Sequence, residues 1–257
     1  MGILDSFRLD GEVAVVTGAG KGIGRAIAIA LAEAGADVAV AARTQSDLDA
    51  VAGEIEALGR RALPLATDAT DMKALENLAE QTVAQLGKLT IWVNNAGGIP
   101  DGAPRYLTRT PEDKFDAQID LNLKAVWMGA TIAAGKMAEN GGAIVNISSR
   151  SAFGPQVKNG PYGAAKAAVN SLTSTLSVEL APNIRVNAIA PGPVPTENFD
   201  DCMGTDTDEK REKLLGMIGI PLNRYGAPED IAAAVVYMAS PASSWVTGQC
   251  LYVTGGR

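Results

Sequence analysis

The fold is decided by residues 17–24, which read TGAGKGIG. The residues just before this stretch, 13–17, are apolar and β-branched, and the alanine-rich segment 23–33 has the apolar spacing of a helix. A glycine-rich turn between a buried strand and a helix presents backbone N–H groups and the positive end of the helix dipole to an anion. The sequence therefore predicts a pyrophosphate-binding turn near the start of an α/β domain.

The glycine spacing departs from the common G-x-G-x-x-G pattern of dinucleotide-binding turns. Ile23 stands where the third glycine of that pattern belongs, and the spacing that remains is Gly18-x-x-x-Gly22-x-Gly24. A plain tight turn could contain the same glycines. The strand before the turn and the helix after it favour the nucleotide site.

Short apolar segments and longer helical segments alternate along the rest of the chain. Besides 13–17, strands are predicted at 37–42, 63–67, 89–94, 143–148, 185–190 and 250–253, and helices at 47–58, 72–86, 112–138 and 162–181. The strands are continuously apolar, as strands buried on both faces of a parallel sheet are. We therefore expect a single domain over residues 1–257, an α/β fold with a doubly wound, Rossmann-type seven-stranded parallel sheet.

Residues 191–219 leave this alternation. The segment begins with proline and contains charged, methionine-containing helical stretches. Long excursions from compact domains are often functional, so we expect a lid over a ligand site, with a passive surface insertion as the alternative. Apolar side chains in it, such as Phe199, Leu214 and Met217, suit a substrate with an apolar body, although helix packing explains them equally well.

The composition limits the class of partner. Of the 257 residues, 47% are hydrophobic and 20% are charged, which is typical of a globular protein, and the net charge of −7 disfavours a nucleic-acid surface. No apolar run approaches the roughly 20 residues of a membrane span. With only Cys202 and Cys250 and no apolar leader, we expect no disulfide framework and a cytoplasmic location. A small-molecule substrate is the expected partner, with no nucleic acid and no membrane.

The chain contains no histidine. This excludes Ser-His-Asp hydrolysis and acid–base chemistry on imidazole, and it removes the commonest ligand of catalytic zinc. We predict no metal site. Proton transfer must therefore use tyrosine, lysine or carboxylates.

Tyr162 and Lys166 are four residues apart and would share one face of a helix. A cation about 4 Å from a phenol is worth on the order of 4 kcal/mol at an effective dielectric constant of 20, enough to lower a tyrosine pKa from near 10. An ordinary surface pair has the same spacing. Ser149 lies at the end of a predicted strand, thirteen residues before Tyr162, and Ser148 should point to the other face of that strand.

At this point the chain resembles the short-chain dehydrogenase/reductase family. The shared motifs, in the family's order, are T-G-x-x-x-G-x-G at 17–24, Asn-Asn-Ala-Gly at 94–97, Ser149 with Tyr162-x-x-x-Lys166, and Pro191-Gly192. The resemblance covers nearly the whole chain. It implies an oxidoreductase that uses NAD(P) to interconvert a ketone and a secondary alcohol.

The resemblance also implies four catalytic residues. Ser149 would polarise the carbonyl, Tyr162 would exchange a proton with its oxygen, and Lys166 would lower the tyrosine pKa and bind the ribose. Asn122 would hold a water that connects Lys166 to solvent, with a local hydrogen bond inside its helix as the alternative.

The cofactor-binding residues indicated by the glycine turn and by the resemblance are Gly18, Gly20, Lys21, Gly22, Ile23, Gly24, Arg43, Asp68, Asn95, Ala96, Gly97, Tyr162, Lys166, Pro191, Gly192, Val194 and Thr196. In relatives, the residue matching Asp68 holds the adenine. Those matching Ile189, Val194 and Thr196 contact the nicotinamide end. Asp68 as a helix-capping acid and Thr196 as a turn residue are the alternatives.

The choice of cofactor follows from charge. NAD enzymes place an acid about 20 residues after the glycines, at the end of the second strand, to bind the ribose hydroxyls. Here that position holds Arg43, which could clamp a 2′-phosphate, with Lys21 approaching the same group. NADP(H) is therefore favoured and NAD(H) is the alternative, unless both cations are merely solvated.

The resemblance leaves two substrate classes and two states of assembly open. The chain is similar both to 3-oxoacyl-carrier-protein reductases and to hydroxysteroid dehydrogenases, but Asn140 and Asn183 stand where the reductases have basic carrier-docking residues. A nucleotide-sensing regulator without catalysis is a further alternative, although such a protein would be expected to lose Tyr162, Lys166 or Ser149. Relatives pair the long helices across two-fold axes, so we expect a homo-oligomer, either a dimer or a tetramer.

Overall fold

The computed structural model describes residues 2–100, 103–197, 199, 205 and 207–256. A seven-stranded sheet crosses its centre in the order β3-β2-β1-β4-β5-β6-β7, and every neighbouring pair is parallel. The strands are β1 (Val13–Thr17), β2 (Asp37–Ala42), β3 (Ala62–Ala66), β4 (Ile91–Asn94), β5 (Gly142–Ile147), β6 (Ile184–Pro191) and β7 (Cys250–Val253). The predicted doubly wound fold is confirmed.

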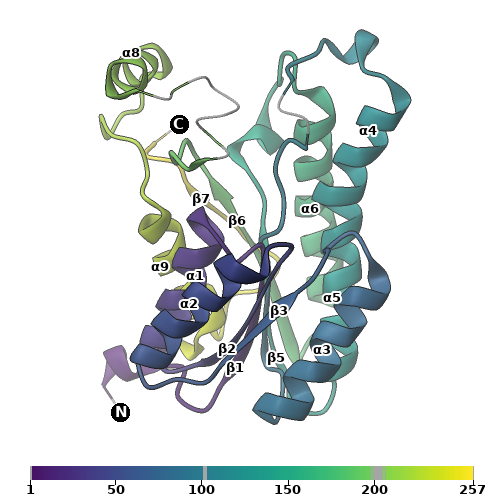
Figure 1. Ribbon diagram of the computed structural model, residues 1–257, viewed down its shortest axis with the longest axis vertical. Coiled ribbons are helices and arrows are strands. Elements are labelled where there is room, and N and C mark those ends of the chain that lie inside the picture. Colours follow the sequence, from purple (N-terminus) through teal and green to yellow (C-terminus); the bar gives the residue numbers. More distant parts are fainter. Residues whose placement is uncertain (1, 101–102, 198, 200–204, 206, 257) are drawn as a thin grey trace.

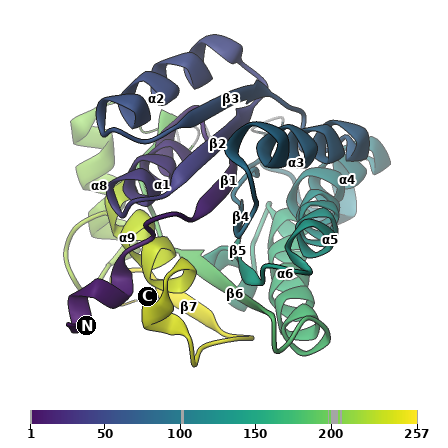
Figure 2. The ribbon, with the colours of Figure 1, turned by 90° about the horizontal axis from the view of Figure 1, so that it is seen from below.

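Helices cover both faces of the sheet (Figures 1 and 2). One face carries α1 (Gly22–Glu33), α2 (Gln45–Ala57) and α9 (Pro228–Ala239), and the other carries α3 (Met72–Leu86), α4 (Glu112–Ile119), α5 (Ala125–Met137) and α6 (Gly160–Glu179). The helix α8 (Asp208–Ile218) stands apart at one end of the molecule (Figure 1). Short 3-10 turns lie at η1 (Ile3–Phe7), η2 (Leu107–Arg109), η4 (Arg150–Phe153) and η5 (Pro241–Ser243).

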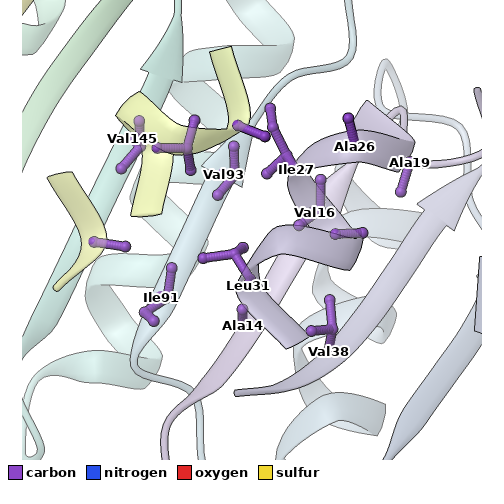
Figure 3. Close-up of a cluster of buried hydrophobic side chains, with 14 of the residues drawn as sticks. Ala14, Val16, Ala19, Ala26, Ile27, Leu31, Val38, Ile91, Val93 and Val145 are labelled. Atoms are coloured by element: carbon purple, nitrogen blue, oxygen red, sulfur yellow. The ribbon is translucent and has the colours of Figure 1, made fainter. Parts of the chain in front are cut away.

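The inner strands β1, β2, β4, β5 and β6 are mainly apolar because both of their faces are buried, whereas the edge strands β3 and β7 are partly exposed. In β1, Ala14 and Val16 pack toward α1 and α9, whereas Val13 and Val15 pack toward the layer of α3 and α5. Leu31 of α1 is fully buried in the first of these clusters (Figure 3). The inner strands therefore pack against helices on both faces, and the sheet becomes a rigid platform.

The strand order reverses at β1, which lies between β2 and β4. In open parallel sheets a crevice forms at such a switch point, beyond the carboxyl ends of the strands. The turn after β1 and the segments after β4 and β5 meet at this edge, so the predicted site residues are brought together by topology.

Two features differ from the sequence prediction. The helix predicted at 112–138 is interrupted by a π-helical turn, η3 (Asp120–Lys124), in which the Asn122 side chain bonds both to Gln118 of the preceding helix and to Gly98 outside it. Helix α9 was not predicted; Arg185 of β6 anchors its last turn by donating to the carbonyls of Met238, Ala239 and Ser240. Within the described residues, no helix is long and apolar enough to cross a membrane.

Candidate active site

A cleft runs along the carboxyl edge of the sheet in two adjoining parts. The part over the predicted catalytic residues has a volume of about 300 Å³, and the part beside the ends of β2 and β3 has a volume of about 680 Å³. The two parts share the lining residues Gly18, Lys21, Ala96 and Gly97. An elongated ligand can therefore occupy both.

The glycine residues of the turn after β1 let its backbone come close to a ligand in the cleft and to the start of α1. Gly18 and Gly22 have φ values of +65° and +53°, which favour glycine, and a Cβ on Gly24 would collide with the carbonyl oxygen of Gly18. The Asn95 amide holds the turn by donating to the carbonyls of Thr17 (2.9 Å) and Gly18 (3.1 Å).

No side chain caps the N-terminus of α1, which begins inside this cradle. Its first N–H groups and the positive end of its dipole therefore face the cleft. The residues present fit the pyrophosphate of a dinucleotide, in agreement with the turn's predicted role.

Lys166 is buried at the inner wall of the smaller part, with only 3% of its surface exposed. Its Nζ donates to the carbonyl of Ile147 (2.8 Å) and lies 5.8 Å from the centre of the Tyr162 ring. Burial lowers the pKa of Lys166 to about 8. A Cβ on Gly97 would lie 3.2 Å from Nζ, so the glycine leaves the ammonium group open to the cleft.

Ser149 and Tyr162 are half-buried and line the same cavity as Lys166. Ser149 caps η4, where its Oγ accepts a hydrogen bond from the Ser151 N–H (3.1 Å). Ser148 turns to the other side, as the alternation of the strand predicts, and its Oγ donates to the backbone carbonyl of Lys166 (3.2 Å). The structure thus brings together a hydroxyl, a phenol and an amine.

Asn122 is fully buried next to this group, but its side chain does not line the cavity. Its Oδ1 accepts from the Gly98 N–H (2.9 Å), and its Nδ2 donates to the carbonyls of Gly98 (2.8 Å) and Gln118 (3.1 Å). The side chain therefore fixes the segment after β4, and the π-helical turn provides the room for it. The water-holding role of Asn122 stays a prediction.

The larger part of the cleft contains Arg43 and Asp68, both exposed. Asp68 accepts hydrogen bonds from the backbone N–H (2.9 Å) and hydroxyl (2.7 Å) of Thr70, and these, with a smaller contribution from Arg43, lower the pKa of Asp68. Asp71, rather than Asp68, caps α3. Among the described residues, no ion pair involves Arg43.

Lys21 lines both parts of the cleft and is paired with two acids. Its Nζ is 3.1 Å from a carboxylate oxygen of Glu197 and 3.8 Å from one of Asp47. The hydrogen bond to Glu197, together with both negative charges, raises the pKa of Lys21. Lys21 therefore bridges the glycine turn, α2 and the segment after β6.

The remaining predicted cofactor residues fall into two groups. Those that line the cleft are Gly20, Ile23, Asn95, Pro191, Gly192, Val194 and Thr196. Ile189 is buried in the hydrophobic core under α1 and α9 instead. Asp47 and Glu197 were not predicted, because nothing local in the sequence marks which acid will face Lys21. Part of the predicted lid, 198, 200–204 and 206, lies outside the described residues.

The chain is similar in sequence to several known oxidoreductases. A family model described as Enoyl-(Acyl carrier protein) reductase matches residues 18–257. The 7alpha-hydroxysteroid dehydrogenase of Escherichia coli K12 is 38% identical over 98% of this chain and 96% of its own length. The chain belongs to the short-chain dehydrogenase/reductase family.

Two further matches support the family and its reaction class. The 3-oxoacyl-[acyl-carrier-protein] reductase of Thermotoga maritima is 36% identical over 97% of this chain and 98% of its own length. A solved structure of a 7 alpha-hydroxysteroid dehydrogenase complexed with NADH and 7-oxo glycochenodeoxycholic acid has a TM-score of 0.91 and 38% identity, covering 100% of this chain and 98% of that one. This short-chain dehydrogenase/reductase is an oxidoreductase acting on CH–OH groups.

The buried amine predicts a measurable pH dependence of stability. In the unfolded chain Lys166 titrates near 10.5, whereas in the folded protein its pKa is about 8. Between these values the unfolded state binds more protons, so the free energy of unfolding contributed by this group rises with pH. Relative to Lys166→Met, the wild type should gain on the order of 3 kcal/mol between about pH 8 and pH 10.5.

Urea denaturation of both proteins across this range measures the difference. Titrations of groups that do not interact with Lys166 affect both proteins equally and cancel, and carrying both proteins in a Tyr162→Phe background removes the neighbouring phenol that does interact. A difference that does not change with pH would show that Lys166 keeps its ordinary pKa in the folded state.

Proposed function

We propose that this enzyme interconverts a ketone with an apolar body and its secondary alcohol, with NADP(H) favoured over NAD(H). The observation that carries the proposal is the single cavity lined by Ser149, Tyr162 and the buried Lys166, continuous with the glycine cradle. An alternative without catalysis, a nucleotide sensor, would have no use for these three groups together.

In the reduction direction the bound nicotinamide supplies the hydride. Ser149 donates a hydrogen bond to the carbonyl oxygen, where negative charge develops. Tyr162 gives its phenolic proton to the same oxygen, and Lys166 stabilises the resulting phenolate electrostatically. In oxidation, Tyr162 takes the proton back. Lys166 also binds the ribose hydroxyls, which its position beside Gly97 supports.

The preference for NADP(H) rests on Arg43. It stands at the end of β2 on the wall of the larger part of the cleft, where the adenosine ribose would lie. A guanidinium there attracts a 2′-phosphate and offers it two parallel hydrogen bonds. A related dehydrogenase of the same fold was solved in complex with NADH, so the fold alone does not select the cofactor, and we assign the selection to the side chain at position 43.

Two substrate classes compete. A hydroxysteroid-like substrate and a 3-oxoacyl thioester are both represented among the relatives. Asn140 and Asn183 lie together near the amino ends of β5 and β6, away from the cleft, and neither provides a cation for a carrier protein. We therefore favour a free or CoA-linked ketone. The lid role of residues 191–219 and the cytoplasmic location stay predictions from the sequence.

The proton transfer is tested by Tyr162→Phe. This change removes only the transferable proton, so kcat should fall by at least about a thousandfold while cofactor affinity stays nearly unchanged. A panel of ketones and alcohols, assayed by nicotinamide absorbance with both cofactors, supplies the activity. Activity within about tenfold of the wild type would contradict the mechanism.

The cofactor preference is tested by Arg43→Asp. Loss of the charged contact should weaken NADP(H) binding by about 1.5 to 3 kcal/mol, roughly ten- to a hundredfold, and the new carboxylate should accept hydrogen bonds from the ribose of NAD(H). The ratio of kcat/KM for NADPH and NADH should therefore invert, measured at fixed ionic strength. A wild type that already favours NADH would show that Arg43 is only a solvated cation.

We also expect a dimer or tetramer. Several large apolar side chains on α4, α5 and α6 are exposed: Phe115, Trp127 and Val178. Burial of these side chains against a second copy of the chain would remove apolar surface from water. Light scattering at micromolar concentration should give two or four times the chain mass of 26.5 kDa, and a monomeric mass would contradict the prediction.

A further inference from the structure

We propose that Lys158 and Arg109 form a subsite for an anionic group of the substrate, a carboxylate or a phosphate, at the start of the catalytic helix α6. The inference deepens the proposed function and rests on it. It names the substrate class as organic anions that combine an apolar body, a ketone or alcohol, and a charged end.

Two cations converge on one aromatic ring. The Lys158 Nζ lies 5.3 Å and the Arg109 Cζ lies 5.9 Å from the centre of the Tyr106 ring. Cation–π contacts at these distances hold both positive groups in place, although each is weak at an exposed site. The ring therefore provides a common contact for the two positive groups.

Among the described residues, no ion pair compensates either cation. The nearest acids along the chain, Glu112 and Asp113, lie in the first turn of α4, where they complement the helix dipole, and Asp113 is 3.5 Å from Lys114. The whole chain carries a net charge of −7. Two cations that contact one ring and have no carboxylate partner in the described part of the chain can both attract an external anion.

The two segments that carry these cations are joined to the catalytic helix. The Arg105 N–H donates to the Lys158 carbonyl (2.9 Å), and Leu107 packs so closely on Gly160 that a Cβ there would lie 3.1 Å from its side chain. Both segments lie where α4 and α6 begin, at the upper end of Figure 1. Lys158 is four residues before Tyr162, so their Cα atoms are at most roughly 14 Å apart.

Lys158 itself has a left-handed backbone, with φ of +64°. Such a conformation is uncommon for a residue other than glycine, asparagine or aspartate. Strained residues of this kind are concentrated at ligand sites, where the strain orients a side chain. In this protein the residue with the left-handed backbone is also the one whose side chain contacts the Tyr106 ring.

The surroundings match the apolar part of such a substrate. Val157 is 75% exposed and Leu107 is 56% exposed, and both are adjacent to the residues that carry or hold the cations. An apolar surface next to a pair of cations suits an amphiphilic anion better than a sugar or a neutral ketone.

The test compares charged substrates with uncharged counterparts. The variants are Lys158→Asn, Arg109→Gln and the double change, and asparagine is chosen because it tolerates the left-handed backbone. The control is Lys88→Gln, which removes a cation that pairs with Glu12 (3.7 Å). The probes are 7-oxo glycochenodeoxycholic acid with its methyl ester, and acetoacetyl-CoA with ethyl acetoacetate.

At low ionic strength the double variant should lower kcat/KM for a charged probe by about tenfold, mainly through KM, and each single variant by about threefold. The uncharged counterpart and the Lys88→Gln control should change less than about twofold. A loss confined to the bile acid pair identifies a carboxylate, and a loss confined to the thioester pair identifies a phosphate. Equal changes for charged and uncharged probes, or no change for either charged probe, would overturn the inference.

Calorimetric binding of the two charged probes separates this inference from the proposed function. One outcome is that the wild type binds a charged probe more tightly than the double variant does and yet reduces none of the four compounds. That result would support the anion subsite and contradict the proposed reaction. Equal binding by both proteins, in the absence of turnover, would overturn the subsite as well.

Discussion

The arrangement of side chains in the smaller part of the cleft depends on the burial of the Lys166 ammonium group. Removing Lys166 from water is unfavourable unless a polar partner replaces the solvent, and that partner is the Ile147 carbonyl at the end of β5. The bond forms only while α6 is docked on β5. Ser148 secures the docking from the strand side by donating to the Lys166 carbonyl. Tyr162 on the helix and Ser149 after the strand are thus held in a fixed relation.

A buried polar network extends the same constraint through the sheet. Asn146 of β5 donates to Thr173 of α6 (2.9 Å) and accepts from Asn94 of β4 (2.9 Å). Trp92 donates to Asn94 (2.7 Å). Among the described residues, no buried side-chain nitrogen or oxygen lacks a partner. A network in which every polar group has a partner is rigid and specifies one arrangement. Asn94, the first residue of the Asn-Asn-Ala-Gly motif, therefore stabilises the sheet and its helices and does not face the cleft.

The sequence predicted the fold and most of the cleft because both depend on local patterns. Continuous apolar runs marked strands buried on both faces, and topology alone then brought the turn after β1 to Ser149 and Tyr162. The π-helical turn at Asn122 was not predictable, since it depends on a hydrogen bond to Gly98, 24 residues away. Helix α9 was missed although proline at its start and the alanine-rich run after it are local signals. The partners of Lys21 could not be predicted because Asp47 and Glu197 approach it only in the folded chain.

The pairing of Lys21 changes how the adenosine end of the cleft should be understood. From the sequence, Lys21 and Arg43 are two equivalent cations for a 2′-phosphate. In the structure, the charge of Lys21 is already opposed by two carboxylates, and Asp47 also faces the cleft beside Gly20. These ion pairs are largely exposed and are weakened by solvent screening, so a phosphate can displace them, but it must do so against two negative charges. In the part of the chain that the structure describes, no acid forms an ion pair with Arg43. The proposed preference for NADP(H) therefore rests on Arg43 more than on Lys21, whose ion pairs join the glycine turn to α2 and to the segment after β6.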